Sequence, residues 1–296
     1  MKILLFVIFS ALSVAHGEVK FHVSIKPLPA EFQPLETTIR THLIAAGEEW
    51  VRHFQTRDCT IEIEFSIREW PSRGGGRSFV AVPLRGERYE GKFVSEEGAA
   101  YKIRTGEDAN GDAPDIEMFF DPAYFRTFWF DPDPKARTAS LPDRNQGKLD
   151  ADTVFLHELG HAFGFNGFRD QKNGILRGEY FSAYDRWVTF DGTNFFFNGP
   201  TVKKLYGKPV LLAHVNNNYH HVGDKEDTTD PKLAEDMMNG IVFDWSHRYY
   251  VTPLDIAMLT DCGLVPQKTK TDKTPDNVPD AAGPNSDPAS SAKQKS

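Results

Sequence analysis

The 296-residue chain contains only two cysteines, Cys59 and Cys262. At most one internal disulfide can therefore form, which excludes the disulfide-rich scaffolds that stabilise small secreted domains. Cys59 opens an apolar segment that we expect to be a strand, and Cys262 ends an expected helix. The sequence leaves two possibilities open, one disulfide or two separate buried thiols.

Basic residues are also in short supply. Lys and Arg number 34 against 42 Asp and Glu, which gives a formal net charge of −8 at pH 7, and the basic residues are scattered along the chain. Nucleic acids and anionic membranes attract proteins that carry a basic stripe or patch. Neither is therefore an expected partner of this chain.

Long apolar runs are confined to the N-terminus. Lys2 precedes a mostly apolar stretch from Ile3 to Val14, and small residues around 13–17 offer a cleavage site. This pattern is typical of a secretory signal peptide, and the run is too short to span a bilayer. We predict a signal peptide over residues 1–17, no membrane span and an exported protein, either secreted or periplasmic.

Large apolar residues are nearly absent from the C-terminal end as well. Residues 267–296 are mainly Lys, Thr, Asp, Pro, Ser and Ala. Such a segment cannot bury enough surface to offset the entropy lost on ordering, so we predict a disordered polar tail. The folded part is then one domain, residues 18–266, which is long enough for a substantial core.

Within that domain the apolar spacing alternates between helical and extended patterns. Apolar positions from Leu35 to Phe54 lie on one helical face, and Cys59–Trp70 alternates as a strand does. Thr252, Pro253 and Gly263 mark the start and stop of a last helix. Further strands are expected at 78–84, 99–104 and 115–120, and a flexible glycine loop at 73–76. The expected fold class is α+β with a mixed sheet.

The most informative motif is His157-Glu158-Leu159-Gly160-His161. It follows a helix start in which Asp150 or Asp152 can be the N-cap, and Gly164 can end the helix. Histidines four residues apart on one helical face can reach the same zinc ion, and the carboxylate between them can accept a proton from a water molecule on that metal. The motif predicts His157 and His161 as zinc ligands and Glu158 as a general base.

These residues resemble those of the metzincin metalloproteases. That family shares the zinc helix, a glycine three residues after the second histidine, a methionine turn and a C-terminal helix, and Gly164 and Met238 match the pattern. The resemblance implies a zincin-type catalytic domain and a secreted zinc-dependent endopeptidase that acts on a protein or peptide substrate. It also implies substrate binding by strand addition near Asp115–Phe120. We expect a monomer.

The third zinc ligand departs from the common metzincin pattern. Gly167 stands where that pattern has a histidine or aspartate, and it cannot bind metal. Leishmanolysin-like metzincins have an insertion before their third histidine, and this chain resembles that arrangement. His221 is the candidate that fits best, with His220 next; the remaining histidine candidates are His214 and His247.

Two alternative hypotheses remain open. Gly178–Asp185 loosely resembles the gluzincin signature, in which Glu179 would be the third ligand, and Asp170 is a further acidic candidate. A secreted zinc-binding or adhesion protein without catalytic activity would need no base, so the presence of Glu158 favours an enzyme. The tyrosine that metzincins carry after the methionine is replaced by Gly240, and either Tyr249 or Tyr250 could take its place as an oxyanion donor.

Overall fold

A computed structural model describes residues 17–176, 178–213, 218–223, 230–240, 243 and 245–267. Almost all of the predicted signal peptide and of the predicted C-terminal tail lies outside these residues, so both stay predictions. The described part has an α+β fold with several sheets, as the sequence predicted. None of the described helices is both long and apolar enough to cross a membrane.

The largest sheet has four strands in the order β1-β2-β6-β3. Strands β1 (Val19–Ile25), β2 (Cys59–Ile67) and β6 (Ile116–Phe120) run parallel, and β3 (Gly74–Ser78) pairs antiparallel with β6. In β2 the alternating apolar side chains are buried, which confirms the strand predicted there. Because β6 has a neighbour on both sides, substrate cannot add to it; β3 is the edge strand instead.

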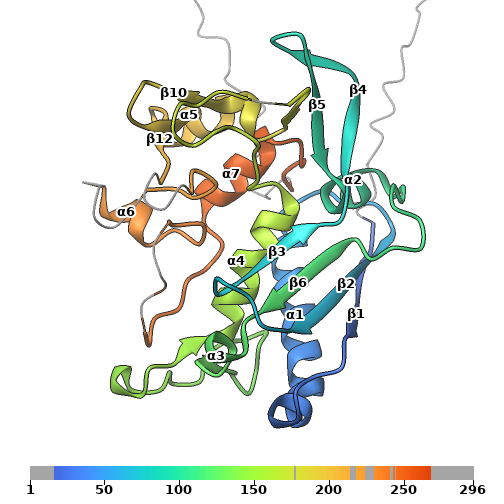
Figure 1. Ribbon diagram of the computed structural model, residues 1–296, viewed down its shortest axis with the longest axis vertical. Coiled ribbons are helices and arrows are strands. Elements are labelled where there is room, and N and C mark those ends of the chain that lie inside the picture. The colour runs from blue at the N-terminus through green and yellow to red at the C-terminus, as the bar shows by residue number, and fades with distance from the viewer. Residues whose placement is uncertain are drawn as a thin grey trace, which may run out of the picture.

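Three helices pack around this sheet (Figure 1). Helix α1 (Glu36–Val51) contacts β1 and α4, α4 (Ala151–Phe163) lies against β3, and α2 (Gly98–Thr105) contacts β2 and α4. The helix predicted from residue 35 is α1, which follows a short 3-10 helix, η1 (Ala30–Leu35).

Two predicted elements near the sheet were wrong. Residues 99–104, expected to be a strand, lie in α2, because Ala99, Ala100 and Ile103 are buried at a helical spacing. The expected glycine loop at 73–76 is largely the edge strand β3. A Cβ atom on Gly76 would lie 2.4 Å from the backbone oxygen of Glu158, so glycine is what lets this strand approach α4.

The remaining strands form three small sheets. The sheets are β4 (Ala81–Tyr89), β5 (Lys92–Glu97) and β9 (Tyr180–Ser182); β10 (Val188–Phe190), β11 (Phe195–Phe197) and β12 (Val210–Leu211); and β7 (Phe128–Trp129) with β8 (Leu149–Asp150). Short helices connect them: α3 (Pro122–Phe125), η2 (Arg144–Gln146), η3 (Asp185–Trp187), α5 (Pro200–Tyr206) and α6 (Pro231–Ala234). The expected strand at 78–84 is therefore split between the end of β3 and the start of β4.

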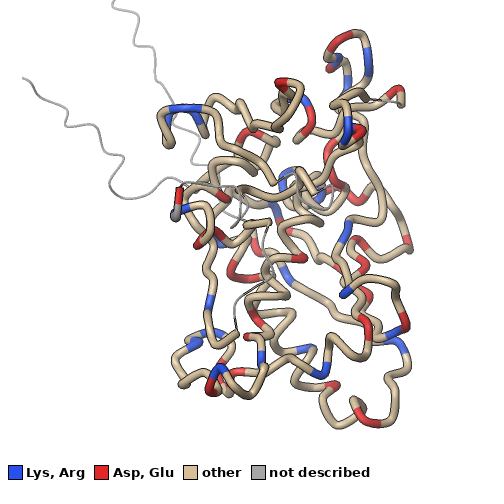
Figure 2. Tube along the Cα trace, turned by 60° about the vertical axis from the view of Figure 1, so that its left-hand side comes forward, with Lys and Arg blue, Asp and Glu red and all other residues tan. Residues whose placement is uncertain are grey.

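The last helix, α7 (Pro253–Asp261), begins as predicted. Thr252 is its N-cap and forms a capping box with Asp255, and Gly263 follows the helix with a φ of 123°. Cys59 and Cys262 are both free, which decides the question that the sequence left open. One hydrophobic core extends from Phe21 to Leu264 and joins the first strand to the last helix. Figure 2 shows acidic and basic residues interspersed over the molecule.

Candidate metal centre

Helix α4 brings the predicted metal ligands to the middle of the fold. Asp150 caps it by accepting a hydrogen bond from the Thr153 amide at 3.0 Å. Asp152, the alternative cap, instead lies 2.7 Å from Nδ1 of His42 on α1. Almost all of the helix is buried, and it ends at Gly164 as predicted. The helix therefore holds His157 and His161 on a rigid support.

Three histidines meet at one point. The Nε2 atom of His157 lies 3.0 Å from that of His221 and 3.2 Å from that of His161, and the last two lie 3.1 Å apart. The three residues form a group that could hold a metal ion. The structure thus brings together all three histidines that the sequence analysis favoured.

Hydrogen bonds to the backbone fix the orientation of each ring. Nδ1 of His157 lies 2.9 Å from the carbonyl oxygen of Met237, that of His161 lies 2.7 Å from Phe165, and that of His221 lies 3.2 Å from Asn218. A carbonyl only accepts, so each Nδ1 carries the proton and each Nε2 presents a lone pair. Three lone pairs that face one another repel unless a cation lies between them.

The donor set fits zinc. A tetrahedral zinc with bonds of about 2.0–2.1 Å separates its ligand nitrogens by about 3.3–3.4 Å, close to the observed spacing. Burial lowers the pKa of His157 to about 3, and it lowers the pKa values of His161 and His221 as well. The rings are therefore neutral near pH 7, which is the form that binds metal.

Comparisons with known proteins give no relative. No family model matches the chain, and neither a curated protein nor a solved structure matches it significantly. What can be said of the site rests on its own geometry.

The segment Asp236–Met238, which precedes α7 in the chain, packs against the helix that carries His157 and His161. Met237 and Met238 are fully buried, and a Cβ atom on Gly160 would lie 2.4 Å from the Met238 sulfur. The Asp236 carboxylate accepts hydrogen bonds from the Met238 amide and the Thr252 hydroxyl. The methionine pair is thereby tied to the cap of α7, and Met237 supplies the carbonyl that orients His157.

Gly167 has a packing role in place of a ligand. A Cβ atom there would lie 2.3 Å from the Tyr219 hydroxyl and 2.4 Å from a carboxylate oxygen of Asp185. The Tyr219 hydroxyl donates to Asp185 at 2.8 Å and accepts from the Arg169 amide at 2.8 Å. These bonds anchor Tyr219. Because Tyr219 lies two residues before His221, they bring His221 back to α4, beside His157 and His161.

Glu158 lies beside the histidines. Its Oε2 atom accepts a hydrogen bond from the Gly76 amide at 2.7 Å. Burial raises the pKa of Glu158 to about 7, while the bond from Gly76 opposes the rise. A carboxyl group that titrates near neutral pH suits proton transfer.

The site opens into a cleft of about 610 Å³. One wall is β3, from Gly74 to Arg77, with Arg73 just before it; the lining also includes Asn218, Phe243 and the three histidines. Tyr124 on α3 also lines it, and the charges of Glu158 and Arg73 both act on its pKa, which burial raises. The sequence analysis missed Gly76 and Tyr124, because both come from distant segments that carry no recognisable motif.

The other predicted ligands lie elsewhere. Glu179 is exposed, and the His247 ring pairs with Glu235 at 2.9 Å. Asp170 accepts hydrogen bonds from the backbone of its own turn. His220 lines the cleft without joining the three-histidine group, and burial lowers its pKa to about 4. His214 is outside the described residues.

Neither of the tyrosines proposed from the sequence lines the cleft. Tyr249 is buried behind it against Phe243, with ring centroids 5.0 Å apart. The ring of Tyr250 instead packs against the guanidinium of Arg137. The tyrosine that does reach the cleft is Tyr124.

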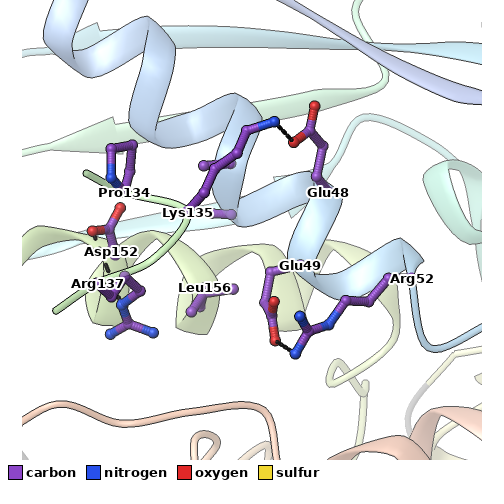
Figure 3. A pocket seen from close by; sticks show the side chains of 10 residues that line it. Glu48, Glu49, Arg52, Pro134, Lys135, Arg137, Asp152 and Leu156 are labelled. Atoms are coloured by element: carbon purple, nitrogen blue, oxygen red, sulfur yellow. Dashed lines mark ion pairs between the residues drawn. The ribbon is translucent and has the colours of Figure 1, made fainter.

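A second hollow, of about 190 Å³, lies between α1 and α4 (Figure 3). Its charged side chains pair with one another, Glu48 with Lys135 and Glu49 with Arg52, both at 2.6 Å. Asp152 and Arg137 line it as well, but with 4.0 Å between them. Balanced charges and the absence of a histidine in its lining make it a poor alternative to the three-histidine group as a metal site.

Proposed function

We propose that the protein is a zinc-dependent endopeptidase with a metzincin-like catalytic domain. The observation that carries the proposal is the convergence of three neutral, hydrogen-bonded imidazoles whose Nε2 atoms lie 3.0–3.2 Å apart. A structural zinc usually has four protein ligands, whereas catalytic zinc has three. Three histidines beside a buried carboxylate, at the wall of an open cleft, favour catalysis.

The histidines and the carboxylate would have separate roles. His157, His161 and His221 would hold the metal, which supplies a Lewis acid that polarises a carbonyl group and lowers the pKa of water to about 7. Glu158 would accept a proton from the attacking water and pass it to the leaving amine. The Gly76 amide holds the carboxylate in place at 2.7 Å.

The cleft suits an extended peptide. Its wall is the edge strand β3, which pairs on one side with β6 and lines the cleft with Gly74, Gly75 and Gly76. A substrate backbone could lie along such an edge and form strand-like hydrogen bonds. Tyr124 would donate a hydrogen bond from its hydroxyl to the oxyanion that forms during hydrolysis, because it shares the cleft with Glu158.

A peptide-library digest tests this function. The protein without residues 1–17 should cleave peptides, lose the activity with a zinc chelator, and regain it when zinc is added back. Metal content is measured on the same samples. Bound zinc with no cleavage of any peptide would favour the non-catalytic zinc-binding alternative, and cleavage that survives complete zinc removal would refute the proposal.

A further inference from the structure

Another hollow, distinct from the one between α1 and α4, is formed by segments that follow cleft-lining residues in the chain. It measures about 370 Å³ and is lined by Ala81, Pro83, Ser95, Phe168, Gly178 and Tyr180. Ser95 is buried with its hydroxyl directed to the carbonyl of Phe181, so the walls that remain are apolar or aromatic. Among the residues that the structure describes, no charged side chain lines the hollow.

Aromatic rings are unusually exposed around this hollow. Phe168 and Tyr180, which line it, are 43% and 46% exposed, and Phe93, whose ring centroid lies 5.6 Å from that of Tyr180, is 39% exposed. Leaving such rings in water forgoes the stabilisation that burial would give, so a contiguous apolar group of this kind marks an interaction site.

The rings are carried by a rigid frame. The Phe168 amide donates to the buried Asp185 carboxylate at 2.6 Å, which fixes the backbone beneath the exposed ring. Tyr180 is part of β9, which pairs with β5, and a small core of Val94, Leu176 and Phe181 lies nearby. The hollow is thus a property of the fold rather than of a loose loop.

Two short segments of the chain connect the cleft to the hollow. On one side, Gly76 of the cleft is five residues from Ala81 of the hollow, and Figure 1 shows the β4–β5 hairpin beyond β3. On the other side, Asn166 of the cleft is two residues from Phe168. At about 3.3 Å per extended residue these links span at most about 7 and 17 Å. A peptide in the cleft would reach the hollow within two to five residues.

We propose that this hollow is a specificity subsite that takes a large apolar or aromatic side chain of the peptide substrate, two to five residues from the bond that is cleaved. The proposal rests on the peptidase function proposed above. Its occupant is the substrate chain itself, because short segments connect the hollow to the cleft on two sides and no charged side chain of the described residues lines it.

Binding to the inactive Glu158→Gln protein loaded with zinc tests the subsite without turnover. The probes are 11-residue peptides in which a single Phe is moved through an otherwise constant sequence, with an all-Ala peptide as reference. Calorimetry should show one position at which Phe binds about tenfold or more tightly than Ala, since burying an aromatic side chain is worth that much. Cleavage of the same peptides by the active protein, read by mass spectrometry, locates the bond.

Variants of the hollow should remove this preference. In Phe168→Ala, and in Ala81→Trp, which fills the hollow, the ratio of Phe to Ala affinity should fall to about one. Leu205→Ala, which removes an equally exposed apolar side chain on α5, should keep the full ratio. Unchanged melting temperatures would show that the variants fold.

The outcomes separate this proposal from the peptidase proposal. Cleavage without any preferred Phe position, or a preference that survives Phe168→Ala and Ala81→Trp, refutes the subsite and leaves the peptidase standing. Tight Phe-dependent binding without cleavage by the active protein supports the hollow as a peptide site and refutes the peptidase. A dimer that dissociates in Phe168→Ala would show that a second copy covers the rings, and would overturn the subsite.

Discussion

At the scale of single residues, the backbone decides what the histidines can do. The carbonyl oxygens of Met237, Phe165 and Asn218 each accept a hydrogen bond from the Nδ1 of one ring. Each ring therefore offers its Nε2 lone pair to the same point, and burial keeps all three rings neutral. The arrangement of protons, more than the count of histidines, makes the group suitable for a cation.

His221→Ala should lose zinc. Removing one of three ligands should weaken binding by more than about 100-fold, since changing a residue that only orients a ligand costs about 10–100-fold. His247→Ala and Glu179→Ala are the controls, because both side chains lie away from the group, and they should keep wild-type affinity. Titration against a chromophoric chelator gives the affinities. Zinc loss in Glu179→Ala would instead support the gluzincin arrangement.

At the scale of elements, the close contact between β3 and α4 positions Glu158, the proposed base. The Gly76 amide reaches Glu158 only because no side chain separates the strand from the helix. The C-terminal half contributes in the same way, since Asp236 joins the methionine pair to the cap of α7. Glu158 and His157 are thus held by segments distant from them in sequence, whereas His161 and His221 are oriented by nearby carbonyl groups.

Gly76→Ala should displace β3. Its Cβ atom would meet the backbone of Glu158, so we expect a loss of about 1–3 kcal/mol in unfolding free energy and a lower kcat, with zinc retained. Gly75→Ala, in the same strand, would bring its Cβ atom 3.2 Å from the edge of the Phe119 ring, and its effect should be smaller. Denaturant unfolding and peptide cleavage measure both; equal effects of the two variants would refute the role given to Gly76.

Glu97 at the end of β5 should make stability depend on pH. Burial raises its pKa to about 8, although the bond from Asn166 opposes the rise. The folded state thus favours the protonated form, and stability falls as pH rises from about 4.5 through 8. Glu97→Gln should lie close to the wild type in stability at pH 5 and exceed it by about 4 kcal/mol at pH 9. The melting temperatures of the two zinc-loaded proteins are measured from pH 5 to pH 9. A difference between them that stays constant over this range would contradict the prediction.

The sequence predicted the elements whose determining residues lie close together in the chain. The α4 motif, its cap and its glycine stop lie within fifteen residues, and the α7 capping box lies within four. His221 could be favoured only from its order in the chain, because its place depends on the Tyr219–Asp185 bond across the insertion. Gly76 and Tyr124 could not be predicted, since a glycine strand and a tyrosine acquire meaning only after the sheet forms.

At the scale of the whole molecule, a single core joins the two ends of the described chain. The Gln55 amide, just after α1, donates to the carbonyl of Val265 at 2.7 Å, and the Gln267 amide donates to His53 at 2.9 Å. Leu264 is buried in the same core.

The effect of a C-terminal truncation on stability should therefore depend on whether these contacts are kept. A chain ending at Gln267 should keep the wild-type melting temperature, because it retains these contacts. A chain ending at Gly263 loses the buried Leu264 and the bonds to His53 and Gln55, and it should lose about 2–5 kcal/mol of stability. Thermal unfolding of both forms measures this, and equal melting temperatures would show that the C-terminal closure contributes little.

The most direct test of the zinc peptidase proposal is a paired measurement on Glu158→Gln. Glutamine has nearly the same shape and can still accept the hydrogen bond from Gly76, but it cannot take up the proton. The variant should bind one zinc per chain as the wild type does, and its kcat/KM for a peptide should fall by about 10²–10⁴-fold. Full zinc content together with undiminished cleavage would contradict the mechanism.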